Sequence, residues 1–188
     1  MKPLTSFFLI LFILILNCDS ISKDKSSQIL INVSFTNAVS SKNLDGRLLL
    51  IFADNDKTEP RFQVSEGLNA QPIFGINVDK LEPDTTVTFD EEVFGYPYEN
   101  LLQLKSGDYY VQAVLHVYEI FNLSTGHSVK LPMDNGEGQH WNTSPGNLYS
   151  TPFKISITEN GIENFDIVLD QVIPEIKVAE DTEWIKHI

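Results

Sequence analysis

The amino-acid sequence predicts an all-β protein, an antiparallel β-sandwich of about seven strands. Three observations support this fold class. Apolar and polar residues alternate with a period of two along most of the chain, turn-forming residues separate the alternating runs, and no segment shows convincing helical periodicity. Because the strand signals do not alternate with helices, a parallel α/β sheet is disfavoured.

The first strand signal is the clearest example of alternation. In residues 28–35 every second side chain is apolar, with Asn32 and Ser34 on the opposite side, which is the pattern of a half-buried strand. Residues 47–53 are apolar almost throughout after Arg47 and fit a strand that is covered on both faces. The remaining strand segments are residues 72–78, 85–90, 107–121, 151–158 and 163–170.

The last two of these segments are separated by a tight-turn signal. Phe153, Ile155 and Ile157 are expected to face inward from residues 151–158. Phe165, Ile167 and Leu169 are expected to face inward from residues 163–170. The turn Glu159-Asn160-Gly161 lies between them, so we expect the two strands to form a hairpin.

One motif refines the type of sandwich. In "LKSGDYYV" the order Leu-x-x-Gly-x-Tyr-x-Val matches the tyrosine corner of immunoglobulin-like and fibronectin III-like sandwiches. In that corner a Tyr at the start of a late strand donates a hydrogen bond to the backbone of the preceding loop. We therefore assign Tyr109 as the corner residue; the alternative is a strand that is rich in tyrosine by chance.

Composition and charge narrow the function classes. The chain has 188 residues, which is ordinary for one domain preceded by a targeting segment. Its net charge is −13, which disfavours nucleic acid as a partner, because such proteins need a basic surface. The single cysteine, Cys18, permits neither an intrachain disulfide nor a cysteine-based zinc cluster.

The N-terminus has the pattern of a secretory signal peptide. Lys2 precedes an apolar run, residues 7–16, that is too short to span a bilayer as a helix. We assign residues 1–20 as the signal, residues 21–27 as a polar tether and the protein as exported: secreted, periplasmic or a cell-surface lipoprotein. Cys18 follows the apolar run, where a bacterial lipoprotein carries its lipid, but Asn17 is a poor lipobox residue, so cleavage after Ser20 or Ser22 competes. A lipid on Cys18 would be the chain's one link to a membrane.

No catalytic or cofactor-binding set emerges from the residues. The pentapeptide Gly-x-Ser-x-Gly of α/β-hydrolases does not occur. His116 lies within a strand and His127 in a turn. Neither has a nucleophilic residue at a sequence spacing typical of a catalytic pair, so a structural role is expected for both. Asp134, Glu137 and His140 are regularly spaced, but neighbouring glycines argue against a helix that would bring them to a metal. We therefore expect no catalytic residue, no cofactor and no metal in this chain.

The chain nevertheless resembles a known class of proteins. The strings "FGYP", "YYVQAVL", "GEGQHWN" and "SPGNLYS", within residues 46–176, resemble the N-terminal region of secreted bacterial esterases. In that family an immunoglobulin-like sandwich precedes an α/β-hydrolase catalytic domain with the nucleophilic serine. The resemblance implies that this chain is a non-catalytic module of a serine esterase, with a C-terminal esterase domain as its partner in cis.

Residues 131–150 are too long and too rich in Gly and Pro to be read as a strand, and their aromatic residues argue against disorder. We expect an ordered Ω-like loop, with Trp141 and Leu148 packed on the sandwich. Its expected use is contact with the neighbouring domain. The residues proposed for this docking loop are Asp134, Glu137, His140, Trp141 and Tyr149.

The domain boundaries follow from these assignments. Residues 28–171 form the sandwich, and residues 172–188 are a linker and the start of the catalytic domain. The apolar end, Trp184, Ile185 and Ile188, suggests that the sequence is a fragment; the alternative is a short terminal element that docks on the sandwich.

Two other functions remain open at this point. The chain could be a free-standing exported sandwich that binds carbohydrate or protein. Its stacking surface would then use Tyr96, Tyr98, Tyr110, Tyr118, Trp141 and Tyr149. An enzyme in its own right is the weakest of the three readings.

Overall fold

A computed structural model gives the fold, and it describes residues 29–67, 69–134, 138, 140–159, 161–177, 180–184 and 186. The predicted signal peptide (1–20), Cys18 and the polar tether (21–27) lie outside the described residues. Among the residues that the structure describes, no helix is long and apolar enough to cross a membrane.

The described residues contain eleven strands and two short 3-10 turns. The strands are β1 (Ile31–Phe35), β2 (Leu44–Ala53), β3 (Ile73–Leu81), β4 (Thr86–Phe89), β5 (Gly95–Tyr96), β6 (Gly107–Asn122), β7 (Ser128–Pro132), β8 (Leu148–Tyr149), β9 (Phe153–Ile157), β10 (Phe165–Leu169) and β11 (Gln171–Val172). The 3-10 turns are η2 (Pro60–Phe62) and η3 (Leu101–Gln103). All seven predicted segments are strands, and β5, β7, β8 and β11 add to them.

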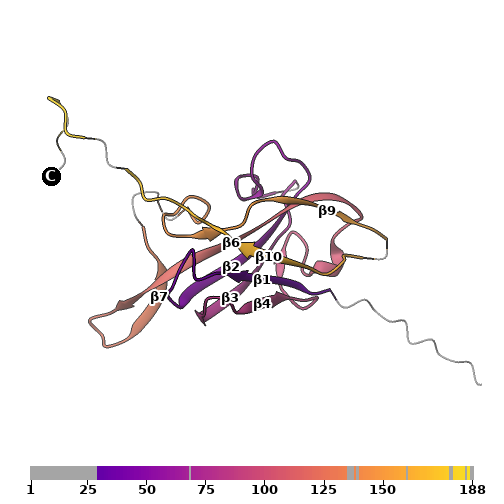
Figure 1. Cartoon of the computed structure of the whole chain (residues 1–188), viewed down its shortest axis with the longest axis horizontal. Coiled ribbons are helices and arrows are strands. Elements are labelled where there is room, and N and C mark those ends of the chain that lie inside the picture. The colour runs from indigo at the N-terminus through magenta and orange to yellow at the C-terminus, as the bar shows by residue number, and fades with distance from the viewer. Residues whose placement is uncertain are drawn as a thin grey trace, which may run out of the picture.

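The strands form a sandwich of two sheets (Figure 1), which confirms the predicted fold class. The small sheet has the order β10-β1-β4. The large sheet has the order β11-β8-β6-β2-β3-β5, with β7 and β9 also paired to β6. Most strand pairs are antiparallel, whereas β1 and β10 run parallel, with Ile31 opposite Phe165 and Phe35 opposite Leu169.

The main core lies between the two sheets and follows the predicted alternation. The inward side chains of β1 are fully buried, including Ile31, Val33 and Phe35. From the large sheet, Phe52 packs edge-on against Phe74, with 5.9 Å between ring centroids. Burial of each such side chain contributes about 1.5–3 kcal/mol, so these layers supply most of the stability of the fold.

Strand β2 is covered on both faces, as its apolar run predicts. Leu48, Leu50 and Phe52 belong to the main core. Leu49 and Ile51 point to the other side of the large sheet, where they form a second apolar cluster with Val114. Something must therefore cover the outer face of the large sheet at this point.

The tyrosine corner is confirmed. The Tyr109 hydroxyl donates a hydrogen bond to the carbonyl oxygen of Lys105, 3.1 Å away. The ring packs edge-on against Phe52, with centroids 6.0 Å apart. The turn η3 precedes this corner, and Asn100 caps it by accepting a hydrogen bond from the Leu102 N–H. The corner thus joins the loop before β6 to the core.

The predicted hairpin of the last two strands is wrong. Strand β9 pairs with β6 in the large sheet, and β10 pairs with β1 in the small sheet, so the turn carries the chain from one layer to the other. Phe153 and Phe165 instead meet across the core, with ring centroids 5.5 Å apart in an edge-on arrangement. A tight turn signals a reversal of direction, and it does not say whether the second strand stays in the same sheet.

Candidate functional site

The outer face of the large sheet is divided into a covered half and an open half. Alternation along β2, β3 and β6 brings to this face the row Ile51, Gln112 and Ile73, and then the row Leu49, Val114 and Gly75. The next row is Arg47, His116 and Asn77. The first two rows are covered by η2 and by Val64, Trp141 and Tyr149, and the third row lies in the open half.

Arg61 is the centre of the covered half. The residue is only 8% exposed, and its guanidinium lies over the rings of Phe62 and Tyr149, at 4.5 and 4.1 Å from their centroids. Nε donates to Glu59 Oε2 at 2.8 Å, and Nη1 donates to the Asn142 carbonyl at 3.0 Å. A buried charge is tolerated here because an opposite charge and hydrogen bonds satisfy it.

Gln112 ties this cluster to the sheet. The side chain is fully buried; its Oε1 accepts from the Arg61 backbone N–H at 3.0 Å. Its Nε2 donates to Glu59 Oε2 at 2.8 Å and to the Ser150 carbonyl at 2.9 Å. Every polar atom of the amide therefore has a partner, which is what burial at this depth requires.

Asn147 fixes the other end of the loop. Its Nδ2 donates to the Trp141 carbonyl at 2.7 Å, and its Oδ1 accepts from the Val117 N–H of β6 at 2.8 Å. Trp141 and Tyr149 pack on the second apolar cluster, and Leu148 is buried in the main core. The packing predicted for Trp141 and Leu148 is thus confirmed, although the outer parts of residues 131–150 belong to strands β7 and β8.

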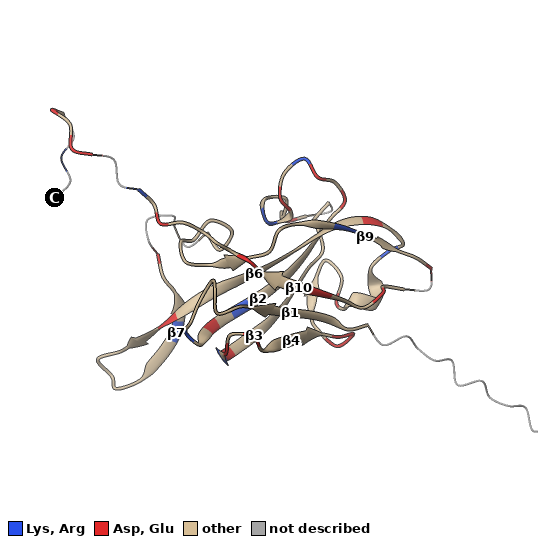
Figure 2. Ribbon diagram, in the orientation of Figure 1, with Lys and Arg blue, Asp and Glu red and all other residues tan. Residues whose placement is uncertain are grey.

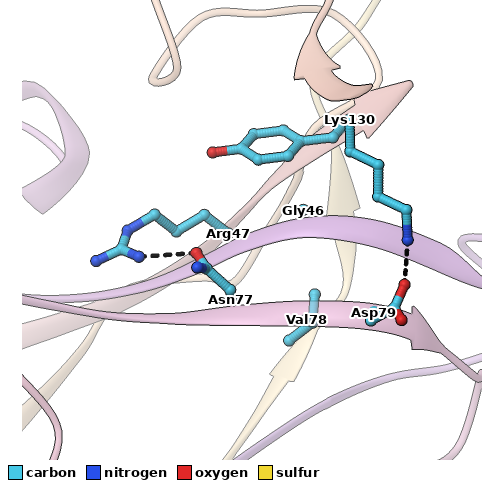
Figure 3. A pocket seen from close by; sticks show the side chains of 7 residues that line it. Gly46, Arg47, Asn77, Val78, Asp79 and Lys130 are labelled. Atoms are coloured by element: carbon cyan, nitrogen blue, oxygen red, sulfur yellow. Dashed lines mark hydrogen bonds and ion pairs between the residues drawn. The ribbon is translucent and has the colours of Figure 1, made fainter. Parts of the chain in front are cut away.

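The open half holds a groove with a volume of about 440 Å³. Its walls come from β2, β3, β6 and β7, which are neighbours in the large sheet. The residues that line it are Gly46, Arg47, Asn77, Val78, Asp79, Tyr118 and Lys130. Figure 3 shows Arg47 and Asn77 together at one end and Lys130 beside Asp79 at the other.

Two glycines make this groove. A Cβ on Gly46 would lie 2.1 Å from the carbonyl oxygen of His116, so only glycine allows β2 to approach β6 this closely. A Cβ on Gly75 would lie 2.8 Å from both Nε and Nη2 of Arg47. The arginine side chain therefore lies flat over β3, and Nη1 donates to Asn77 Oδ1 at 2.8 Å.

Lys130 carries the second positive charge of the groove. Its ammonium forms ion pairs with Asp45, at 2.8 Å, and with Asp79. Hydrogen bonds from Lys130 and then from the Lys80 N–H lower the pKa of the Asp45 carboxyl below its ordinary value of 3.8. The bond to Asp45 in turn raises the pKa of Lys130. Acidic and basic residues accordingly lie side by side where β2, β3 and β7 meet (Figure 2).

The structure places the residues proposed for the docking loop in different surroundings. Glu137 lies outside the described residues, while Asp134 and His140 are exposed. Asp134 accepts a weak hydrogen bond from the Gly138 N–H, and the His140 carbonyl accepts from Thr143 and Ser144, which closes one turn. Trp141 and Tyr149 are half-buried against the sheet. Their docking role remains a prediction.

The six aromatic residues proposed as a stacking surface are also spread over several surroundings. Tyr98 packs against the main core, and Trp141 and Tyr149 cover the second cluster. Tyr96 is exposed at the β5 edge, and Tyr118 lines the groove. His116 contacts Tyr118 edge-on, with ring centroids 5.4 Å apart.

Sequence reasoning missed Arg47, Asn77 and Lys130 as site residues. Alternation does place Asn77 opposite the apolar Ile76 and Val78, but Arg47 only precedes an apolar run that shows no polar side. Their adjacency depends on the pairing of β2 with β3, which no local pattern reveals.

Searches against protein-family models, curated proteins and solved structures find no match for this chain.

Proposed function

We propose that this chain is a non-catalytic β-sandwich module of an exported hydrolase and that it docks on the catalytic domain. The observation that carries the proposal is an apolar arm that projects from the sandwich. The arm consists of the end of β6, from Tyr118 to Asn122, with β7 and the turn between them. The signal-like N-terminus and the resemblance to secreted esterases support the rest of the proposal.

The arm exists because β6 is much longer than its neighbours. Sixteen residues give a strand of about 50 Å, while pairing with β2 ends at Asp45 and Tyr118. Beyond that point β6 pairs with β7 alone, with Ile120 opposite Lys130 and Phe121 opposite Val129. Figure 1 shows the β7 hairpin reaching past the rest of the sheet.

The arm carries apolar side chains on both faces. Ile120 is 57% exposed and Leu131 is 50% exposed, and Leu123 at the turn is exposed as well. Phe121 and Val129 are half-buried. An isolated two-stranded ribbon with exposed apolar side chains is only marginally stable in water. A partner that covers the arm would therefore stabilise it.

The path of the C-terminal segment indicates what this partner is. Residues 171–173 pair along β8 and the adjacent loop: the Ile173 N–H donates to Asn147, and the Gly146 N–H donates to Ile173. The segment then passes a hollow of about 830 Å³ next to Glu119 of β6, where Val172 and Ile176 are exposed. A domain that follows this segment would emerge at the same end of the sandwich as the arm (Figure 1).

Binding in trans tests the docking. The chain is titrated with a separately purified catalytic domain from a secreted esterase that has a related sandwich, and the dissociation constant is measured by calorimetry. We expect Leu131→Asp to weaken binding at least tenfold, because it places a charge in an apolar contact. Leu102→Asp is the matched control, since Leu102 is 63% exposed at the opposite end of β6.

Two results would contradict the proposal. Equal affinity of the Leu131→Asp variant and the parent would remove the arm from the interface. Hydrolysis of a chromogenic ester by the purified chain above the buffer rate would show that the module is itself a catalyst.

A further inference from the structure

The open groove on the large sheet contains an arginine without an acidic partner. None of the ion pairs formed by the described residues includes Arg47. Its one side-chain hydrogen bond, to Asn77, uses Nη1 and leaves Nε and Nη2 to other partners. The chain has 26 acidic and only 13 basic residues, so a guanidinium without an acidic partner is unexpected on its surface. It is therefore a candidate to bind an anionic ligand.

The guanidinium is also held in place. Gly75 provides the space beneath it, because any Cβ there would lie 2.8 Å from Nε and Nη2. Asn77 fixes one edge of the fork at 2.8 Å. A planar fork that is fixed in this way suits the two oxygens of a carboxylate, and less of its side-chain entropy is lost on binding.

The remaining walls suit a sugar. Tyr118 supplies an aromatic ring, Asn77 an amide and Asp79 a carboxylate, which together can contact the C–H face and the hydroxyls of a pyranose. The volume of about 440 Å³ is within the range of small-ligand sites. Lys130 is held by Asp45 and Asp79, whereas Arg47 has no ion pair among the described residues. The groove therefore offers one guanidinium to a ligand, which matches the single charge of a carboxylate better than the double charge of a phosphate.

We propose that this groove binds a uronic acid, a sugar that carries one carboxylate, with the carboxylate on Arg47 and the ring beside Tyr118. The site lies on the open half of the large sheet. It shares Tyr118 and Lys130 with the arm but does not include Leu131 or Leu102. The variants that test it change Arg47 and Gly75, which lie outside the arm, so its failure can be told apart from a failure of docking.

Calorimetric titration of the chain tests the site with four probes: sodium galacturonate, galactose, acetate and inorganic phosphate. We expect galacturonate to bind and the other three to bind at least tenfold more weakly. Acetate binding as tightly as galacturonate would overturn the assignment of a sugar. Galactose or phosphate binding as tightly would overturn the assignment of a carboxylate, and no binding of galacturonate would overturn the site.

Three variants locate the binding on Arg47. Arg47→Gln removes the charge, and Gly75→Ala keeps the charge but displaces the guanidinium. Each variant is expected to bind galacturonate at least tenfold more weakly than the parent. Lys57 is an exposed lysine beyond the other end of β2. Lys57→Gln changes the net charge by the same amount as Arg47→Gln and should bind galacturonate as the parent does. If Gly75→Ala does not fold, Arg47→Lys, a cation without the fork, replaces it. Parent-like affinity in Arg47→Gln would refute the proposal.

Discussion

Replacement of Gln112 by leucine is the sharpest test of how the loop is held on the sheet. The side chain is fully buried and makes three hydrogen bonds, to the Arg61 N–H, to Glu59 and to the Ser150 carbonyl. Leucine has a similar volume and can make none of them. The backbone groups of Arg61 and Ser150 would then be buried without partners, whereas the Glu59 carboxylate, about a third exposed, can turn to water.

The expected cost follows from those two buried groups. Each unsatisfied group costs about 1–3 kcal/mol, and added apolar burial recovers about 1–2 kcal/mol. The two groups together cost about 2–6 kcal/mol, so after the recovered burial the free energy of unfolding should fall by about 2.5 kcal/mol, the middle of the resulting range. For a domain of this size that corresponds to a decrease of roughly 5–15 °C in the melting temperature.

Urea titration followed by tryptophan fluorescence measures this change. The chain has two tryptophans, and Trp184 is 86% exposed, so Trp141 on the second cluster reports on the loop. Gln103→Leu is the control, because Gln103 is exposed and its side chain makes one hydrogen bond, with the Glu99 N–H. The change in its free energy of unfolding should stay within about 0.5 kcal/mol. A loss below about 1 kcal/mol in Gln112→Leu, with Trp141 emission unchanged, would refute this account of the network.

Three further predictions concern the corner, the groove and the sheet. Tyr109→Phe removes the corner hydrogen bond and should cost about 1 kcal/mol in urea unfolding; a change below the error would show that the ring alone holds the corner. Because the folded pKa of Asp45 is lowered, its contribution is present above pH 3.8 and is lost as the pH falls through the folded pKa. Asp45→Asn should therefore lower the melting temperature at neutral pH, and this effect should shrink as the pH falls below 3.8 and vanish below the folded pKa of Asp45. An equal effect at neutral and at acidic pH would contradict the assignment. Gly46→Ala should cost about 3 kcal/mol or more in urea, since its Cβ meets the rigid backbone at His116, whereas Gly75→Ala meets a movable side chain and should cost less; the reverse order would contradict this packing.

The local features of the fold could be predicted from the sequence. Alternation in residues 28–35 correctly assigned the buried face of β1, and the apolar run after Arg47 correctly indicated a strand covered on both sides. The corner motif located the Tyr109 hydrogen bond. Each of these depends on neighbours within a few residues, which is the range over which side-chain periodicity is informative.

The long-range features could not be predicted in this way. The chain crosses between the sheets after β9 because Phe153 and Phe165 pack across the core, and a turn signal is the same for a hairpin and for a crossing. Gln112 inside an apolar strand was a visible signal of a buried polar contact. Its partner Arg61 lies 51 residues earlier, and nothing local connects them. The groove likewise depends on the register between β2 and β3.

The parallel pairing of β1 with β10 sets the order in which the fold can be completed. These strands are the first and nearly the last of the sandwich, and the side chains of Asn32 and Asp166, 134 positions apart, join them at 2.8 Å. During synthesis β1 must wait, with one edge unpaired, until residues 165–169 have left the ribosome. Folding is then expected to be slow, on the order of milliseconds to seconds, as for other topologies dominated by distant contacts. Nascent chains that stall before Phe165 should therefore be the natural clients of chaperones and the preferred substrates of proteases.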